Sequence, residues 1–198
     1  MESRCVLPTT QFAYRKGLGS CDNLLCVVHT LQCALEMGQK ACMVQIYFGI
    51  AFDRFTHQGI LFKFYSVGIG GSVLFFLTEF LSNNYWSQYV VLDGCRSKLF
   101  NVVSVVPRGP VLDLQLFLLY TAELFFIVES KLNGYPDDYT LAAVMSSPAE
   151  RVAVTEAMNR DQNRVCLWSD LWGMKLNVDK TKTMIIAWLH TVHPQLTH

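Results

Sequence analysis

The residues with the clearest chemical potential are two adjacent carboxylates, Asp137 and Asp138, which follow Tyr135 and Pro136. Carboxylate oxygens are hard ligands of the kind that Mg²⁺ prefers. The same four residues also fit an ordinary type I turn, because proline followed by aspartate favours that turn. Taken alone, the acidic pair therefore leaves both interpretations open.

Other candidate motifs are better explained by structure than by chemistry. The segment Gly68-Ile69-Gly70-Gly71 has the glycine content of a phosphate-binding loop. It follows a predicted helix instead of a strand and lacks the lysine and hydroxyl residue that end such loops, so we predict a helix–helix turn. His29 and His57 lie on or beside predicted helices. We predict that they are packed or exposed side chains and not metal ligands.

Net charge argues against tight binding of nucleic acid by this chain alone. The chain has 198 residues, and 16 Lys and Arg balance 16 Asp and Glu, which gives a formal net charge of zero. Nucleic-acid binders are usually basic, because contacts to phosphate supply most of their affinity. The basic residues Arg15, Lys16 and the group at 175–182 favour a solvated face, with contact to nucleic acid as the alternative.

The composition is apolar for a soluble domain, with 52% hydrophobic and 16% charged residues. The longest apolar run, 111–128, is interrupted by Asp113, Gln115 and Glu123. A bilayer span needs about 20 mostly apolar residues with few or no charges, so we predict no membrane helix. The first 16 residues lack the apolar core of a secretion signal. The apolar excess instead predicts surfaces that other domains would cover.

Cysteine usage indicates a reduced, intracellular protein. The seven cysteines form no CxxC pair, so neither a zinc site nor a disulfide framework is predicted. Location in the nucleus or in the cytoplasm stays open.

Hydrophobic periodicity and turn signals predict a single α+β domain. Asp22 is the expected N-cap of a first helix that ends at Gly38, and Ser147 to Glu150 is the expected capping box of a later helix that ends at Gly173. The expected elements, in order, are a helix from 22, a strand at 42–48, helices at 57–67 and 72–83, a hairpin at 88–103 around Asp93-Gly94, a helix from Pro110, a hairpin at 128–145, a helix to Trp172 and a strand or strand pair at 176–188. This order predicts a sheet that helices cover mainly on one face.

Five segments in a fixed order carry a family resemblance. They are Gln11 to Gly17 followed by Asp22, Ile46 to Asp53 followed by His57, Ser104 to Leu112 running into Leu116 to Tyr120, Gly134 to Asp138, and Trp172 to Asn177 followed by Lys180 to Thr183. Together they resemble the reverse transcriptases of non-long-terminal-repeat retrotransposons. The resemblance covers nearly the whole chain, and it rests on the order of the five segments more than on any one of them.

The resemblance implies a polymerase palm, a ferredoxin-like antiparallel sheet with helices on one face, with partial fingers and no thumb. It divides the domain, residues 1–198, into a fingers–palm junction at 1–40 and a palm at 41–190. The implied activity is RNA-templated DNA synthesis by two-metal nucleotidyl transfer. The implied cofactor is Mg²⁺, and the implied partners are an RNA template, a DNA primer and deoxynucleotides.

The resemblance also assigns roles to individual positions. Asp137 matches a metal ligand and catalytic residue, and Asp138 matches its companion. The second metal-binding aspartate of the family falls on Tyr47, whose neutral phenol is a poor Mg²⁺ ligand. Asp53 lies six residues further on, past the strand end, and we do not expect it to substitute. Lys180 matches a catalytic lysine that protonates the leaving pyrophosphate.

Three further positions match substrate-binding residues of the family. Phe52 matches the bulky residue beneath the nucleotide sugar. Gly109 matches a glycine that lets template and nucleotide approach the backbone. Arg108 stands where the family has glutamine, and Pro110 where it has serine.

Departures from the family pattern gather at functional positions, whereas the apolar skeleton persists. We therefore expect this copy to be catalytically inactive, chiefly because Tyr47 replaces a metal-binding aspartate. Two alternatives stay open, namely a non-enzymatic nucleic-acid-binding remnant and a non-functional pseudogene product.

Overall fold

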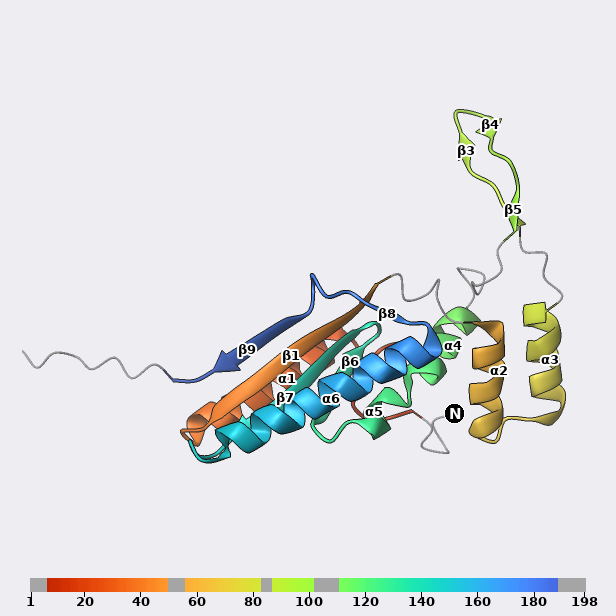
Figure 1. The fold of residues 1–198 in the computed structure, drawn as a ribbon. Coiled ribbons are helices and arrows are strands. Elements are labelled where there is room, and N and C mark those ends of the chain that lie inside the picture. Colours follow the sequence, from red (N-terminus) through yellow and green to blue (C-terminus); the bar gives the residue numbers. More distant parts are fainter. Residues whose placement is uncertain (1–6, 50–55, 83–86, 102–110, 189–198) are drawn as a thin grey trace, which may run out of the picture.

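A computed structural model of the chain describes residues 7–49, 56–82, 87–101 and 111–188 (Figure 1). Its elements, in chain order, are α1 (Ser20–Glu36), β1 (Lys40–Gly49), α2 (His57–Ser66), α3 (Gly71–Ser82), β2 (Ser87–Gln88), β3 (Val91–Leu92), β4 (Cys95–Arg96), β5 (Phe100–Asn101), α4 (Val111–Thr121), α5 (Leu124–Ile127), β6 (Lys131–Tyr135), β7 (Asp138–Met145), α6 (Glu150–Trp172), β8 (Lys175–Leu176) and β9 (Lys182–Ile186). The predicted order of helices, strands and hairpins is confirmed over these ranges.

One antiparallel sheet organises the domain, with β1 as its central strand. β7 pairs with β1 along eight residues, from Lys40 opposite Met145 to Tyr47 opposite Asp138. β6 lies outside β7, and the short strands β8 and β9 pair with successive parts of the other edge of β1. β6 and β7 follow one another in the chain, so a short turn is enough to join them as an antiparallel pair.

The main core lies on one face of this sheet. Alternate residues of β1, namely Val44, Ile46 and Phe48, are buried there. The Phe48 ring meets the rings of Tyr139 on β7 and Trp168 on α6 edge-on, with centroid separations of 5.6 and 5.8 Å. The helices α4, α5 and α6 complete this core, and Figure 1 shows α6 running across the front of the sheet.

The reverse face carries a lighter cover, from α1, which Figure 1 shows behind the sheet. Lys131 on β6 donates from Nζ to the Thr30 hydroxyl at 2.8 Å, and Trp188 donates from Nε1 to the carbonyl of Leu35 at 2.8 Å. The one-sided cover expected from the sequence thus holds for the main core, and α1 adds a partial cover on the other side.

Helix ends follow the predicted chemistry with two shifts in position. α1 begins after Gly19, and Asp22, the expected N-cap, instead accepts a hydrogen bond from the Gly19 amide at 2.7 Å. α6 begins at Glu150, whose carboxylate accepts from the Ser146 amide at 2.9 Å, so Ser147 is not the cap. In both cases an acidic side chain in the first turn reaches back to an unpaired amide. Gly173 ends α6 in the left-handed region, with φ of 70°, as predicted.

A buried ammonium joins α2 to the rest of the core. The side chain of Lys63 is 6% exposed, and its Nζ donates to a carboxylate oxygen of Glu123 at 2.5 Å. The same Nζ lies 3.9 Å from the ring centroid of Trp172, 5.0 Å from Trp168 and 5.2 Å from Tyr120. Burial lowers the pKa of Lys63, although Glu123 acts in the opposite direction. This cation, unlike most lysines, is part of the packed interior.

The hairpin around Asp93 and Gly94 is confirmed, but it is small and projects from the body (Figure 1). Both turn residues have positive φ, 49° and 79°, which two-residue hairpin turns of this kind require. Its apolar side chains are exposed, among them Leu92 at 73% and Val90 at 68%.

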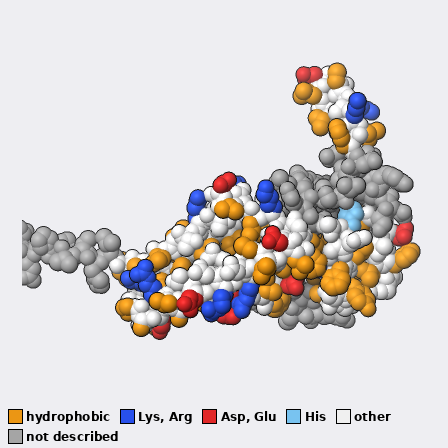
Figure 2. Space-filling view, viewed as in Figure 1, with side chains coloured by type: hydrophobic (Ala, Val, Ile, Leu, Met, Phe, Trp, Pro, Cys, Tyr) orange, Lys and Arg blue, Asp and Glu red, His pale blue; other side chains and the backbone are white. Residues whose placement is uncertain are grey.

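Apolar side chains also reach the surface on α2 and α3, where Figure 2 shows them gathered at one end of the molecule. Phe62, Tyr65, Phe75 and Phe76 are each more than half exposed. The apolar composition predicted uncovered surface of this kind. Among the described residues no helix has the length and apolarity needed to cross a bilayer. The six cysteines within the described ranges are free thiols.

Candidate functional site

The acidic pair lies at the tip of the β6–β7 hairpin. Tyr135 pairs with Asp138, so Pro136 and Asp137 form a two-residue turn and Asp138 is the first residue of β7. The four residues therefore form a turn, and this turn places the acidic pair at the tip of a hairpin.

The sheet register brings Tyr47 directly against this hairpin. Tyr47 on β1 is the cross-strand partner of Asp138 on β7. Directly opposed residues of an antiparallel pair project from the same face, with Cβ atoms about 4.5–5.5 Å apart. The Tyr47 phenol and the Asp138 carboxylate thus share one face of the sheet. The resemblance places the second metal-binding aspartate of the family at position 47, beside the hairpin carboxylates.

That face is the reverse of the one that holds the main core. Phe48 and Tyr139, each adjacent in sequence to one member of the pair, are buried on the core side. On the open side the register continues with Gln45, which is opposed by Thr140 on one edge and by Lys182 on the other. A polar strip therefore crosses three strands beside the hairpin tip.

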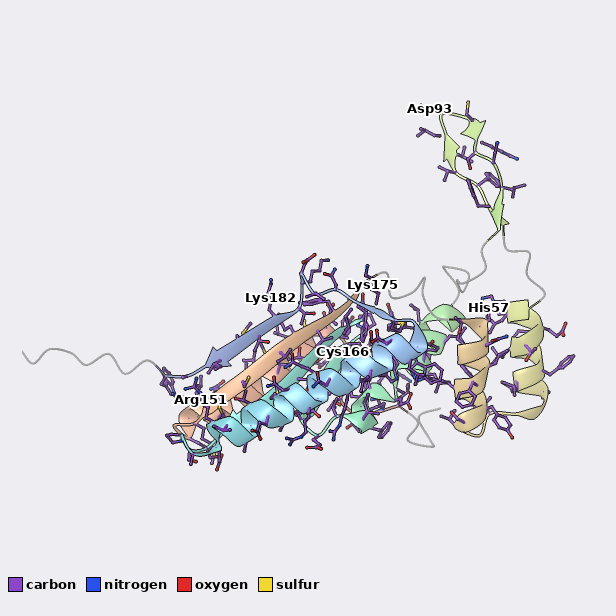
Figure 3. All side chains as sticks on the ribbon, in the orientation of Figure 1. His57, Asp93, Arg151, Cys166, Lys175 and Lys182 are labelled. Carbon is purple, nitrogen blue, oxygen red and sulfur yellow. The ribbon has the colours of Figure 1, made fainter. Side chains whose placement is uncertain are left out.

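Two lysines at the edge of the sheet face the same region. Gly49 is the partner of Lys175, and Gln45 is the partner of Lys182, so both lysines have the strand parity of Tyr47. Both are exposed, and Figure 3 places them along the edge formed by β8 and β9. The sequence predicted a solvated face for this group, and these two residues are solvated.

Lys180 lies in a tight turn between β8 and β9 that is attached to β1. The Asn177 amide donates to the carbonyl of Tyr47 at 2.8 Å, and the Lys180 amide donates to the Asn177 side chain at 3.2 Å. Thr181 closes the turn through its hydroxyl, which donates to the Asn177 carbonyl at 2.9 Å. The turn holds Lys180 near enough to Asp138 for its charge to act on that carboxylate.

The surroundings of Asp138 at the hairpin tip disfavour its ionised form. Burial raises the pKa of Asp138, the neighbouring charge of Asp137 raises it further, and Lys180 only partly offsets both. Two adjacent carboxylates raise each other's cost of ionisation when no cation lies between them. The Lys180 charge therefore does not compensate fully for the burial of Asp138 and for its repulsion by Asp137.

Replacing Asp138 with asparagine is expected to stabilise the fold at neutral pH. The pKa of Asp138 is raised in the folded state, so its ionisation above that pKa reduces stability, and the effect disappears below the unfolded pKa. The gain should stay below about 1 kcal/mol because the residue is exposed and screened by solvent. Urea unfolding at pH 7 and at pH 3 measures the gain in the free energy of unfolding. An equal gain at both pH values would show that the ionisation of Asp138 is not its cause.

The described side chains do not fit the two-cation centre that the resemblance implies. Such a centre needs carboxylates from both neighbouring strands, and β1 contributes a phenol at that position. Within the described ranges, no group of three or more His, Cys, Asp or Glu side chains is arranged to hold a metal ion. The hairpin pair alone lacks the number of hard oxygen ligands that Mg²⁺ requires from a protein and its substrates.

Several predicted site residues lie outside the described residues. Phe52 and Asp53 fall within 50–55, and Arg108 and Gly109 fall within 102–110. The structure therefore brings together Tyr47, Asp137, Asp138 and Lys180 from the predicted set.

Sequence reasoning missed Asp161, which fixes the entry to the hairpin. Its side chain is fully buried and accepts hydrogen bonds from the amides of Glu129 and Ser130 at 2.9 and 2.8 Å. Arg164 donates to it at 3.0 Å. A signal was present in the sequence, because Asp161 falls three residues after Met158 and four before Val165, in the apolar series of α6.

Comparisons with known proteins show the family to which the chain belongs. A family model described as reverse transcriptase (RNA-dependent DNA polymerase) matches residues 2–194. The sequence is similar to the "RNA-directed DNA polymerase from mobile element jockey" of Drosophila funebris, with 28% identity over 88% of this chain and 19% of that protein. The protein of the same name from Drosophila melanogaster is 23% identical over 91% of this chain and 20% of its own length. The chain thus spans about a fifth of the length of these relatives.

Two solved structures share the fold. One is the apo telomerase from Candida tropicalis truncated from its C-terminal domain, with a TM-score of 0.56, 12% identity and coverage of 92% of this chain and 37% of that chain. The other is the telomerase from the same organism in complex with a fragment of telomeric RNA, with a TM-score of 0.54, 13% identity and coverage of 89% and 30%. At these identities the likeness concerns the fold, and it confirms the predicted palm-type architecture.

Proposed function

Because the chain belongs to the reverse transcriptase (RNA-dependent DNA polymerase) family, we propose that it is the palm of such an enzyme from a non-long-terminal-repeat mobile element and that this copy does not polymerise DNA. The single observation that carries the second part is the pairing of Tyr47 with Asp138. The palm would occupy residues 41–190, behind a fingers–palm junction at 1–40.

The family partners follow from this assignment. An RNA template, a DNA primer and deoxynucleotides would meet the open face that carries Tyr47, Asp138 and Lys180. Lys175 and Lys182 support a contact with phosphate, since both are exposed on that face. In active members Mg²⁺ would lie between the acidic side chains of the two strands. Here Asp137 and Asp138 remain as hard ligands, and the phenol of Tyr47 adds bulk without charge.

We expect the purified chain to show no Mg²⁺-dependent primer extension on an RNA template. Loss of one preorganised electrostatic group costs about a hundredfold to a thousandfold in other enzymes, and the lost group here would bind both cations. A full-length polymerase from a jockey element serves as the positive control. Robust synthesis that Asp137→Ala abolishes would overturn the proposal of inactivity.

A negative extension assay has more than one explanation, so a direct measurement of cation binding complements it. Tb³⁺ is a probe for oxygen ligands, and nearby tyrosines sensitise its luminescence. Tyr47→Asp is expected to bind Tb³⁺ at least about tenfold more tightly than the unmodified chain, because a second strand then contributes a carboxylate. Tyr47→Asn is the matched control, without the charge. Equal affinity in all three proteins would show that residue 47 does not face the hairpin carboxylates.

A further inference from the structure

We infer that Gln11 is a positioning residue for the β6–β7 hairpin, which it holds from the outer edge of the sheet. The inference rests on the proposed function, since the hairpin matters as the carrier of Asp137 and Asp138. The Gln11 side chain acts through Gly134 and Tyr139, the pair of residues directly below Tyr135 and Asp138 in the hairpin.

The backbone around Gln11 extends the sheet by one residue beyond β6. The Gly134 amide donates to the Thr10 carbonyl at 3.0 Å, and the Phe12 amide donates to the Gly134 carbonyl at 3.0 Å. Gln11 itself forms an isolated parallel bridge with Gly134. β6 is the outer strand of the described sheet, and this bridge satisfies the polar groups of Gly134 that would otherwise face outward.

The Gln11 side chain is locked in place inside the protein. Gln11 is 1% exposed, and its Oε1 accepts a hydrogen bond from the Ala13 amide at 3.0 Å. Arg15 donates from Nη1 to the carbonyls of Pro8 and Gln11, at 2.8 and 3.2 Å. These bonds hold the segment in a tight turn around its own glutamine, so the amide has a fixed position.

Gly134 accommodates this side chain because it has none of its own. A Cβ at position 134 would lie 3.0 Å from the Gln11 Nε2, 3.0 Å from a ring carbon of Tyr139 and 2.8 Å from the Phe125 ring. The three groups therefore pack directly onto the Gly134 backbone. Gly134 has no positive φ, so close approach, and not backbone conformation, explains the glycine.

The contact continues to the acidic pair through Tyr139. Tyr139 is the cross-strand partner of Gly134 and immediately follows Asp138. Its ring is 2% exposed, and burial raises the pKa of its phenol, while the nearby Thr121 and Gln11 side chains act in the opposite direction. Gln11 thus contacts both strands of the hairpin one step below its two-residue turn, where a small displacement would move Asp137 and Asp138 together.

Hydrogen exchange tests whether Gln11 holds the hairpin. Gln11→Met keeps the length of the side chain and removes its amide group, so exchange of the Gly134 and Tyr139 amides is expected to accelerate about tenfold. Gln32→Leu is the matched control, since Gln32 is exposed on α1 and its side-chain amide donates to Glu36 at 2.8 Å, away from the hairpin tip; it should leave both rates within about twofold. Unchanged exchange at Gly134 in Gln11→Met would overturn the inference.

Tb³⁺ binding separates positioning from plain stability. In a Tyr47→Asp background, Gln11→Met is expected to weaken Tb³⁺ binding about tenfold at a temperature where both proteins are fully folded. Gln11→Glu keeps the acceptor for the Ala13 amide; it should recover part of the affinity and stands in if Gln11→Met does not fold. Faster exchange with unchanged Tb³⁺ affinity would make Gln11 merely structural and overturn the inference. Failure of Tyr47→Asp to bind Tb³⁺ would instead count against the proposed function, and the exchange measurement would still decide whether Gln11 holds the hairpin.

Discussion

Replacing Glu123 with alanine is expected to lower the free energy of unfolding by about 2–4 kcal/mol, because it leaves the buried ammonium of Lys63 without its counter-charge. The Lys63 side chain is 6% exposed, whereas that of Glu123 is 47% exposed, so the cost arises mainly on the lysine. Trp168 also loses the acceptor of its indole N–H, which lies 3.0 Å from the same carboxylate oxygen. Urea unfolding followed by tryptophan fluorescence measures the loss.

The pH dependence identifies Lys63 as the cause. Burial lowers the pKa of Lys63 even with Glu123 present, and removing Glu123 should lower it further. A lysine whose folded pKa is depressed reduces stability fully below that pKa, and the penalty shrinks as pH rises toward its unfolded value, roughly 10.4. The deficit of Glu123→Ala should therefore be smaller at about pH 9.5 than at about pH 7.

Lys63→Met provides the matched comparison for this pair. It removes the buried charge and keeps an unbranched apolar side chain among Tyr120, Trp168 and Trp172, so we expect a change below about 1.5 kcal/mol. Glu123 then remains half exposed with its hydrogen bond from Trp168. A loss in Lys63→Met as large as that in Glu123→Ala would mean that the ion pair and the cation–aromatic contacts, and not an uncompensated charge, dominate.

Replacing Asp161 with asparagine is expected to lower the free energy of unfolding by about 2–4 kcal/mol. The Asp161 carboxylate accepts hydrogen bonds from three donors, whereas an asparagine amide would direct its own N–H groups at one of these donors. The side chain is fully buried and accepts from the Glu129 and Ser130 amides and from Arg164. These bonds join the middle of α6 to the loop that leads into β6. The variant should therefore loosen the hairpin as well as lower the melting temperature.

Asp170, which lies on the same helix as Asp161, provides the control, and a pH series tests the role of the Asp161 charge. Asp170→Asn, at an exposed position of α6, should change stability by no more than about 0.5 kcal/mol. Burial by itself would raise the pKa of Asp161, but the hydrogen bonds from Ser130, Glu129 and Arg164 outweigh it and lower the pKa. A carboxyl of this kind stabilises the fold above its unfolded pKa, and the contribution is lost as pH falls through the folded value. The difference between wild type and Asp161→Asn should therefore narrow below about pH 4; a constant difference would exclude the charge as its source.

The sequence by itself determined the elements and their order, because these depend on local patterns. The strand at 42–48, the Asp93-Gly94 turn and the helix end at Gly173 were all predicted from neighbours in the chain. Cap positions were less accurate. Asp22 and Glu150 accept hydrogen bonds from the backbone amides of Gly19 and Ser146. Because an acidic side chain can accept from an amide that precedes it by three or four residues, its presence does not fix the residue at which the helix begins.

The family was also determined by the sequence, since ordered motifs survive when individual residues change. The motifs placed Tyr47 and the acidic pair as neighbours, and the antiparallel register of β1 and β7 pairs Tyr47 with Asp138. Residues 47 and 138 are 91 positions apart in the chain, so their spacing alone does not show that they are neighbours. The match of both motifs to the family does.

Only the tertiary structure decided which polar residues became part of the interior. Gln11 and Lys63 look like solvated residues in sequence, and Asp161 is marked only by its place in the apolar series of α6, yet the three residues are 1%, 5% and 0% exposed. Each is buried because groups distant in the chain supply its partners, namely Gly134 for Gln11, Glu123 and three aromatic rings for Lys63, and two loop amides for Asp161. Burial of a polar group is tolerable only when such partners converge, and that convergence is a property of the folded chain, which no local pattern encodes.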